Sequence, residues 1–253
     1  MRRRLTDRIL AVLFPERCAF CGEVIPVGTE LCPACREEER LWRIRPPVCP
    51  FCGRETAGCI CGRHRRLFER CVSAYSYCGA VRKGILRLKR QAKPDAVRFF
   101  ADRMTEVIRR EYGQTRFDGI VPVPLSRMAL KKRGYDPNLW LAQELSKRLA
   151  VPVTAGLVKL YETRPQKELC ARERSGNLLG AFDWRGDPSP EGRRFLLVDD
   201  VVTTGSTLEE CAKMLKIYGA VQVLAASAAA TRRETARQTD GGGDRFGGNG
   251  SGT

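Results

Sequence analysis

The stretch of sequence that decides the fold reads Phe195-Leu196-Leu197-Val198-Asp199-Asp200-Val201-Val202-Thr203-Thr204-Gly205-Ser206-Thr207. Its continuous apolar start indicates a strand buried on both faces. Two carboxylates, Asp199 and Asp200, follow where the ligands of open α/β sheets bind. A loop rich in hydroxyls then opens a helix, whose free N–H groups favour an anion, and Gly205 permits a tight turn beside it. Because carboxylates accept hydrogen bonds from sugar hydroxyls but repel a bare polyphosphate, the stretch predicts a sugar-phosphate site. A plain turn capped by Asp200 and Thr204 explains fewer of its positions.

The residues on either side of this stretch alternate between strand-like and helical patterns. Apolar runs predict strands over 71–77, 119–124, 194–198 and 221–229, and helical periodicity predicts helices over 96–112, 138–149 and 206–218. Strands that alternate with helices of this length are typical of an α/β fold with a mostly parallel, doubly wound sheet.

Cysteines dominate residues 15–71, which contain nine of the twelve in the chain. Eight of them form four close pairs: Cys18 and Cys21, Cys32 and Cys35, Cys49 and Cys52, Cys59 and Cys61. Paired cysteines in tight turns predict tetrahedral zinc coordination, and metal binding can fold a segment too short for a core of its own. The simplest grouping is one structural zinc on the first four and a second on the last four. Cys59-x-Cys61 is closer than usual, so His64 is an alternative ligand to Cys59, and an iron–sulfur cluster is an alternative to zinc.

The net charge of +16 is concentrated in the middle of the chain, where residues 81–150 carry +10. Such an excess favours a polyanionic partner, and the candidate nucleic-acid residues are Arg87, Lys89 and Arg90. A solvated basic face is the alternative interpretation. No run approaches the ~20 apolar residues of a membrane span, and no signal peptide is evident, so we expect a cytoplasmic protein.

Composition divides the chain into four segments. We expect an amphipathic helix over 1–14, the cysteine-rich zinc module over 15–71, the α/β domain over 72–231 and a disordered Gly-rich tail over 232–253. The tail has too few apolar residues to offset the entropy of ordering it.

Residues 195–207 resemble the signature with which type I phosphoribosyltransferases bind phosphoribosyl pyrophosphate (PRPP). With the cysteine module, Asp118-Gly119-Ile120-Val121-Pro122-Val123-Pro124-Leu125 and Arg133-Gly134-Tyr135, the chain resembles the ComF family, except that Asp136-Pro137 replaces the family's usual Asn-Gln. The resemblance implies a type I phosphoribosyltransferase fold behind a small double zinc ribbon. It implies that Asp199 and Asp200 are the catalytic acids that hold the ribose hydroxyls, and that Mg²⁺ bridges the pyrophosphate. The implied PRPP-binding residues are Val201, Val202, Thr203, Thr204, Gly205, Ser206 and Thr207, of which 203–207 hold the 5′-phosphate.

By the same resemblance, the basic segments 124–133 and 161–178 correspond to the loops that approach pyrophosphate in such enzymes. Their candidates for neutralising the leaving group are Arg127, Arg133, Arg164 and Lys167.

The resemblance implies a PRPP- and Mg²⁺-binding protein that transfers a phosphoribosyl group to an unidentified acceptor and takes part in DNA uptake. The alternative is a zinc-containing module without catalysis that binds single-stranded DNA or a helicase-type ATPase of the uptake machinery. Its PRPP pocket would then be regulatory or vestigial.

Overall fold

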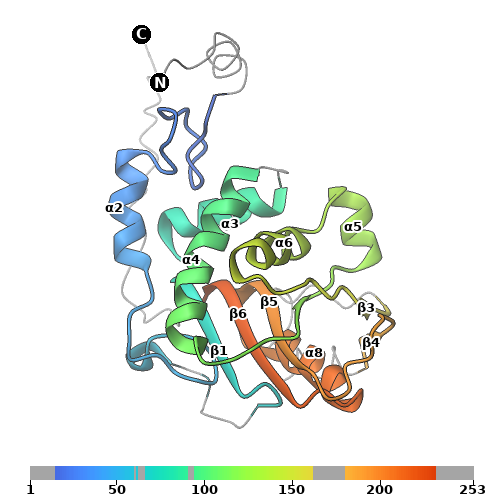
Figure 1. Ribbon diagram of the computed structural model, residues 1–253. Helices are drawn as coiled ribbons and strands as arrows, with labels where there is room; N and C mark the ends of the chain where they lie inside the picture. The colour runs from blue at the N-terminus through green and yellow to red at the C-terminus, as the bar shows by residue number, and fades with distance from the viewer. Residues whose placement is uncertain (1–14, 60, 62–65, 91–93, 162–179, 232–253) are drawn as a thin grey trace, which may run out of the picture.

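A four-stranded parallel sheet forms the centre of the molecule. The computed structural model describes residues 15–59, 61, 66–90, 94–161 and 180–231. The strand order is β1-β6-β5-β2, with β1 (Arg70–Ser76), β6 (Gln222–Ala230), β5 (Arg194–Val202) and β2 (Gly119–Pro122). Figure 1 shows β1, β6 and β5 side by side in this order. All three pairings are parallel, so the predicted α/β sheet is confirmed.

Helices cover both faces of this sheet. On one face, α3 (Gly79–Arg90), α4 (Pro94–Tyr112) and α6 (Pro137–Leu149) share a core with Leu196 and Val198 of β5. On the other face, α8 (Ser206–Ile217) packs with Phe195 and Leu197 (Figure 1). Alternate β5 residues therefore enter opposite cores, as expected for a strand buried on both faces.

Several short elements were not predicted. An antiparallel pair, β3 (Leu157–Lys159) and β4 (Phe182–Trp184), packs on α8, and α5 (Arg127–Arg133) follows β2 without burying a residue. The cysteine-rich segment contains α2 (Pro33–Trp42) and the 3-10 turn η1 (Thr56–Gly58). The missed α3 is amphipathic: Val81, Ile85 and Leu88 point into the core, whereas basic residues occupy its other faces.

The cysteine-rich segment packs directly onto the α/β domain. Phe20 lies among Tyr75, Phe99 and Phe100, with ring centroids 6.2, 5.1 and 5.8 Å away. Further along, the Ile44 N–H donates to the Ala74 carbonyl and the Cys71 N–H to the Pro50 carbonyl, at 3.0 and 2.7 Å. The segment thereby covers the outer edge of β1.

The predicted N-terminal helix over 1–14 and the predicted tail over 232–253 lie outside the described residues. Within the described part of the chain, no helix has the length and apolar character needed to cross a membrane.

Candidate functional site

The acid pair lies where β5 extends past its neighbour. β5 continues to Val202, four residues beyond the predicted strand, whereas β2 ends at Pro122, opposite Val198. Asp199 and Asp200 follow Val198, so they lie beyond the last residue of β5 that pairs with β2. They are only 9% and 6% exposed. Because all four strands run parallel, the segments that follow them gather at this same edge.

A lysine on α3 neutralises one of these acids. The Lys89 Nζ lies 2.9 Å from Asp200 Oδ1. Burial by itself lowers the pKa of Lys89, but the charges of Asp200 and Asp199 outweigh it and hold that pKa above its ordinary value. The Lys89 ammonium thus offsets the charge of the acid pair at this edge of the sheet.

The second acid is held in hydrogen bonds but remains costly to ionise. Asp199 Oδ1 accepts from Asn138 Nδ2 at 3.1 Å and from the Asp200 N–H at 2.9 Å. Burial, followed by the charge of Asp200, raises the pKa of Asp199 to about 7. Asn138 is itself 3% exposed, and its buried Oδ1 has no hydrogen-bond partner in the described structure.

Asn138 owes its position to the residue pair that departs from the family pattern. The Asp136 side chain caps α6, since Oδ1 accepts from the Asn138 and Leu139 N–H groups at 2.8 and 3.2 Å. Its other oxygen, Oδ2, accepts from the Leu125 N–H at 3.4 Å. Pro137 occupies the first turn of the helix, where its missing N–H costs nothing. Asp136-Pro137 thus orients the helix that presents Asn138 to Asp199.

The loop after β5 has the geometry of an anion cradle. Gly205, the N-cap residue of α8, has a φ of +83°, in the left-handed region that favours glycine, and brings no side chain to the start of the helix. The hydroxyls of Thr204 and Ser206 lie 2.8 Å apart. The N-terminal N–H groups of α8 and these hydroxyls therefore gather beside the acid pair, where they suit a phosphate.

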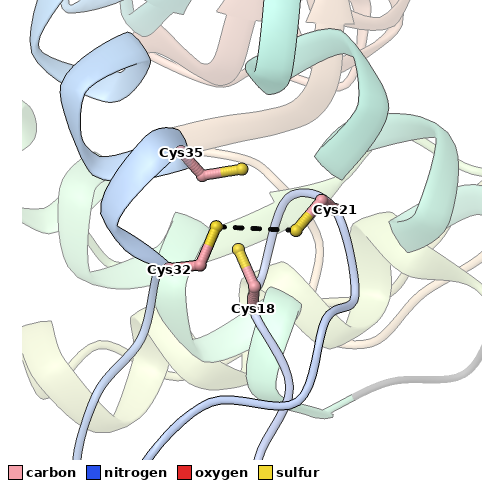
Figure 2. A group of neighbouring side chains, drawn as sticks. All are labelled: Cys18, Cys21, Cys32 and Cys35. Atoms are coloured by element: carbon pink, nitrogen blue, oxygen red, sulfur yellow. Dashed lines mark hydrogen bonds between the residues drawn. The ribbon is translucent and has the colours of Figure 1, made fainter.

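The eight paired cysteines form two clusters. In each of them the four sulfurs lie within 4.8 Å of one another: Cys18, Cys21, Cys32 and Cys35 in the first ribbon, and Cys49, Cys52, Cys59 and Cys61 in the second ribbon. Figure 2 shows the first quartet, with Cys32 and Cys35 where α2 begins and Cys18 and Cys21 on the preceding loop, all pointing inward.

The spacing of the sulfurs fits zinc. Tetrahedral sites with Zn–S bonds of about 2.3 Å have sulfurs roughly 3.8 Å apart. The sulfurs of Cys21 and Cys32 are 3.7 Å apart, as are those of Cys49 and Cys61, whereas those of the close pair Cys59 and Cys61 are 3.2 Å apart. Burial raises the pKa of Cys49 to about 12, so a thiolate there needs a cation beside it. Cys59 completes the second quartet, whereas His64, its proposed substitute, lies outside the described residues.

Comparisons with known proteins agree with both parts of this architecture. The family model described as "Double zinc ribbon domain" matches residues 9–82, and "Phosphoribosyl transferase domain" matches residues 138–241. Competence protein F of Haemophilus influenzae is 30% identical over 221 residues, which cover 83% of this chain and 95% of that protein. The chain belongs to the ComF family. DNA utilization protein YhgH of Escherichia coli is 32% identical and covers 83% of the chain, and Competence protein ComFC of Bacillus subtilis is 26% identical and covers 74%.

Among solved structures, the glutamine PRPP amidotransferase of B. subtilis overlaps 56% of this ComF chain and 30% of its own, with 17% identity and a TM-score of 0.38. The predicted fold, a phosphoribosyltransferase domain behind a double zinc ribbon, is confirmed by the two family models together with the parallel sheet and the cysteine clusters.

The other residues singled out from the sequence lie in different places. Arg127 is exposed on α5 and Arg133 is half-buried at its end, while Arg164 and Lys167 fall outside the described residues. Of the three nucleic-acid candidates only Arg90 is exposed. Lys89 lies at the acid pair, and the guanidinium of Arg87 packs against Gly22 of the first ribbon.

Sequence reasoning missed four residues around the site: Lys89 as a partner of Asp200, Asn138, Arg54 and Arg66. Lys89 and Asn138 follow strands whose carboxyl ends meet at this edge, so the topology of a parallel sheet offered a signal for them. Arg54 and Arg66 come from the second ribbon and its continuation, and nothing in their spacing connects them with residues 199–207.

Proposed function

We propose that residues 199–207 bind PRPP together with Mg²⁺. One observation carries the proposal: two buried carboxylates adjoin a helix N-terminus that begins at a left-handed Gly205, on one edge of a parallel sheet. Carboxylates accept from vicinal ribose hydroxyls, and the loop donates to the 5′-phosphate, so the two halves match the two ends of a ribose 5-phosphate.

Asp199 and Asp200 are the residues proposed to hold the ribose, with the Lys89 ammonium paired with Asp200 beside them. Mg²⁺ is usually bound through substrate phosphates and one or two carboxylates rather than by a protein cage, which agrees with the few acids here. If transfer occurs, the C1–oxygen bond breaks towards pyrophosphate while the acceptor forms the new bond at C1. Arg127 and Arg133 are proposed to offset the charge of that leaving group. The acceptor is left unassigned.

Calorimetric titration with PRPP and Mg²⁺ tests the ribose half of the site. Asp200→Asn preserves the shape but replaces an acceptor oxygen by a donor, and losing a hydrogen bond to a charged group weakens binding by roughly 10- to 150-fold. Asp95→Asn, an exposed change on α4, is the control and should leave the affinity unchanged. A wild-type protein that fails to bind PRPP at millimolar concentration would refute the proposal.

Gly205→Val tests the phosphate half against a strain control. Gly205 and Gly192 have φ values of +83° and +69°, and in both cases an added Cβ meets nothing closer than 3.8 Å. Valine at either position therefore costs a similar amount of backbone strain. Only Gly205→Val should abolish PRPP binding, because its side chain enters the space of the phosphate. Equal affinity in the two variants would place the phosphate elsewhere.

A second function, contact with single-stranded DNA, is favoured by α5. This helix buries no residue and carries Arg127, Lys131, Lys132 and Arg133 without an acidic residue. We propose that it binds the phosphate backbone, in keeping with relatives named for competence and DNA utilization.

Fluorescence anisotropy with a labelled single-stranded oligonucleotide, titrated at several salt concentrations, tests this second function. Replacing Lys131 and Lys132 by Glu should flatten the dependence of log affinity on log salt by about 1.4, at roughly 0.7 for each lost phosphate contact. Lys213→Glu on α8 is the control. No binding by the wild type at low salt would exclude direct DNA contact.

A further inference from the structure

We propose that the second ribbon is a working part of the phosphate site, so that zinc held by Cys49, Cys52, Cys59 and Cys61 sets the affinity for PRPP. Two arginines make the connection: Arg54 as a residue that positions the loop, and Arg66 as a residue that also binds the phosphate. The inference rests on the proposed function and adds a form of regulation to it.

Arg54 joins the metal site to the phosphate loop, the first through its backbone carbonyl and the second through its guanidinium. Its carbonyl accepts from the Cys49 N–H at 2.7 Å, which closes the turn of the Cys49–Cys52 pair. Its guanidinium donates to the carbonyl of Thr203 in the phosphate loop and to the carbonyl and hydroxyl of Thr231. Arg54 is 3% exposed, so this charge is held by oxygen dipoles rather than by water. One residue thus fixes the end of β5 relative to the end of β6.

The backbone around Arg54 has little freedom to move. Gly53 has a φ of +68°, and a Cβ added there would lie 2.9 Å from the Ser73 nitrogen of β1. Only glycine permits the turn to lie this close to the strand. The second ribbon is therefore pressed against β1, and a change in its turn is transmitted to the Arg54 guanidinium.

Arg66 approaches the loop from the continuation of the second ribbon. Its Nη2 donates to the Thr204 carbonyl at 3.0 Å, and its guanidinium carbon lies 3.8 Å from where a Cβ of Gly205 would be. The adjacent Leu67 N–H donates to the Glu209 carboxylate in the first turn of α8, at 3.1 and 3.3 Å. Arg66 thus lies across the turn at the N-terminus of α8, where its positive charge favours a bound phosphate.

The first ribbon provides the matched comparison. It packs on α3 and α4 through Phe20, and Arg87 of α3 contacts it at Gly22. Beside it, Glu30 pairs with Arg103 of α4, and Glu38 of α2 accepts from the Ala80 N–H of α3, so the contacts of this segment run to α3 and α4. Loss of metal from the first ribbon should therefore leave the phosphate loop unchanged, whereas loss from the second ribbon should release it.

Full-length protein loaded with zinc, together with Cys59→Ser and Cys21→Ser, tests the coupling. Both cysteines are among the less buried members of their quartets, so both variants have a fair prospect of folding. Hydrogen exchange of residues 203–207, measured without ligand, should accelerate in Cys59→Ser and not in Cys21→Ser. PRPP affinity should fall about tenfold or more in Cys59→Ser alone, the effect of one lost hydrogen bond to a charged group.

Arg66→Met and Arg87→Met repeat the comparison without touching the metal ligands. Arg66→Met should lose at least tenfold in PRPP affinity while its zinc content stays unchanged, and Arg87→Met should retain wild-type affinity. If the wild type binds PRPP, but Cys59→Ser binds it as tightly as Cys21→Ser and Arg66→Met as tightly as Arg87→Met, the inference is wrong and the proposed function stands. If the wild type binds no PRPP, the proposed function fails, and equal loop exchange in Cys59→Ser and Cys21→Ser then refutes the coupling separately.

Discussion

Asp199→Asn should make the protein more stable, and more so at alkaline than at acidic pH. Burial and the charge of Asp200 raise the pKa of Asp199 from 3.8 to about 7. Between these values the folded protein holds a proton that the unfolded chain releases, so the free energy of unfolding falls as the pH rises through this window. Asparagine cannot ionise, yet its Oδ1 can still accept from Asn138 and from the residue 200 N–H.

The size of the effect follows from the shift. At about 1.4 kcal/mol for each unit of pKa, the raised pKa of Asp199 costs the fold roughly 2 kcal/mol at pH 5, where the folded carboxyl keeps its proton, and on the order of 4 kcal/mol at pH 8, where it is ionised. The stabilisation by Asp199→Asn should therefore grow by up to about 3 kcal/mol across this range. Urea unfolding of zinc-loaded protein, followed by tryptophan fluorescence, measures it at both pH values.

Asp183→Asn is the control, because the pKa of Asp183 is shifted in the opposite direction to that of Asp199. The Tyr218 hydroxyl donates to Asp183 at 2.8 Å and holds the pKa of that carboxyl below its ordinary value, so its replacement should bring no gain at pH 8. A gain from Asp199→Asn that is equal at pH 5 and pH 8, or a loss at pH 8, would refute the reasoning that this carboxylate is held at a cost to the fold.

Three further measurements test the metal sites, the shared core and the helix cap. Purified protein should contain one to two zinc ions per chain by plasma mass spectrometry, and a preparation containing mainly iron would contradict the ribbon assignment. Phe20→Ala should lower the free energy of unfolding by about 3–5 kcal/mol, because its ring is fully buried among Tyr75, Phe99 and Phe100; a loss under 1 kcal/mol in urea unfolding would show that the first ribbon folds separately. Asp136→Ala removes the cap of α6 and should cost about 1 kcal/mol, whereas Asp95→Ala, an exposed change in the first turn of α4, should cost less in the same assay.

The sequence sufficed for the features that depend on local pattern. The apolar run 195–198 and the two acids after it were enough to predict β5 and the carboxylate pair. A strand buried on both faces has a continuously apolar sequence, so the pattern is visible locally. Cysteine spacing indicated two metal quartets for a similar reason, since each pair lies within a single turn.

The features that depend on long-range packing could not be predicted in this way. Lys89 was read as part of a basic surface, yet the turn of α3 directs its ammonium to Asp200. Phe20 follows the cysteine pattern of the segment 15–71, yet its ring belongs to the core shared with α4. Arg54 is 149 residues from Thr203 in the chain, and only the tertiary fold brings the two together.

The order of the strands has a consequence for how the chain is synthesised. β1 pairs with β6, and Arg70 lies opposite Leu224. Because β1 is synthesised first and β6 last, the backbone hydrogen bonds on the inner edge of β1 can form only when the sheet is complete. On the ribosome, the ribbon segment emerges before β1 and is ready to cover the outer edge as soon as that strand appears. Only one edge of β1 then remains open to wrong partners during translation. Chains that stop before residue 222 keep this edge open for good, so incomplete products should aggregate or be degraded while full-length chains close their own sheet.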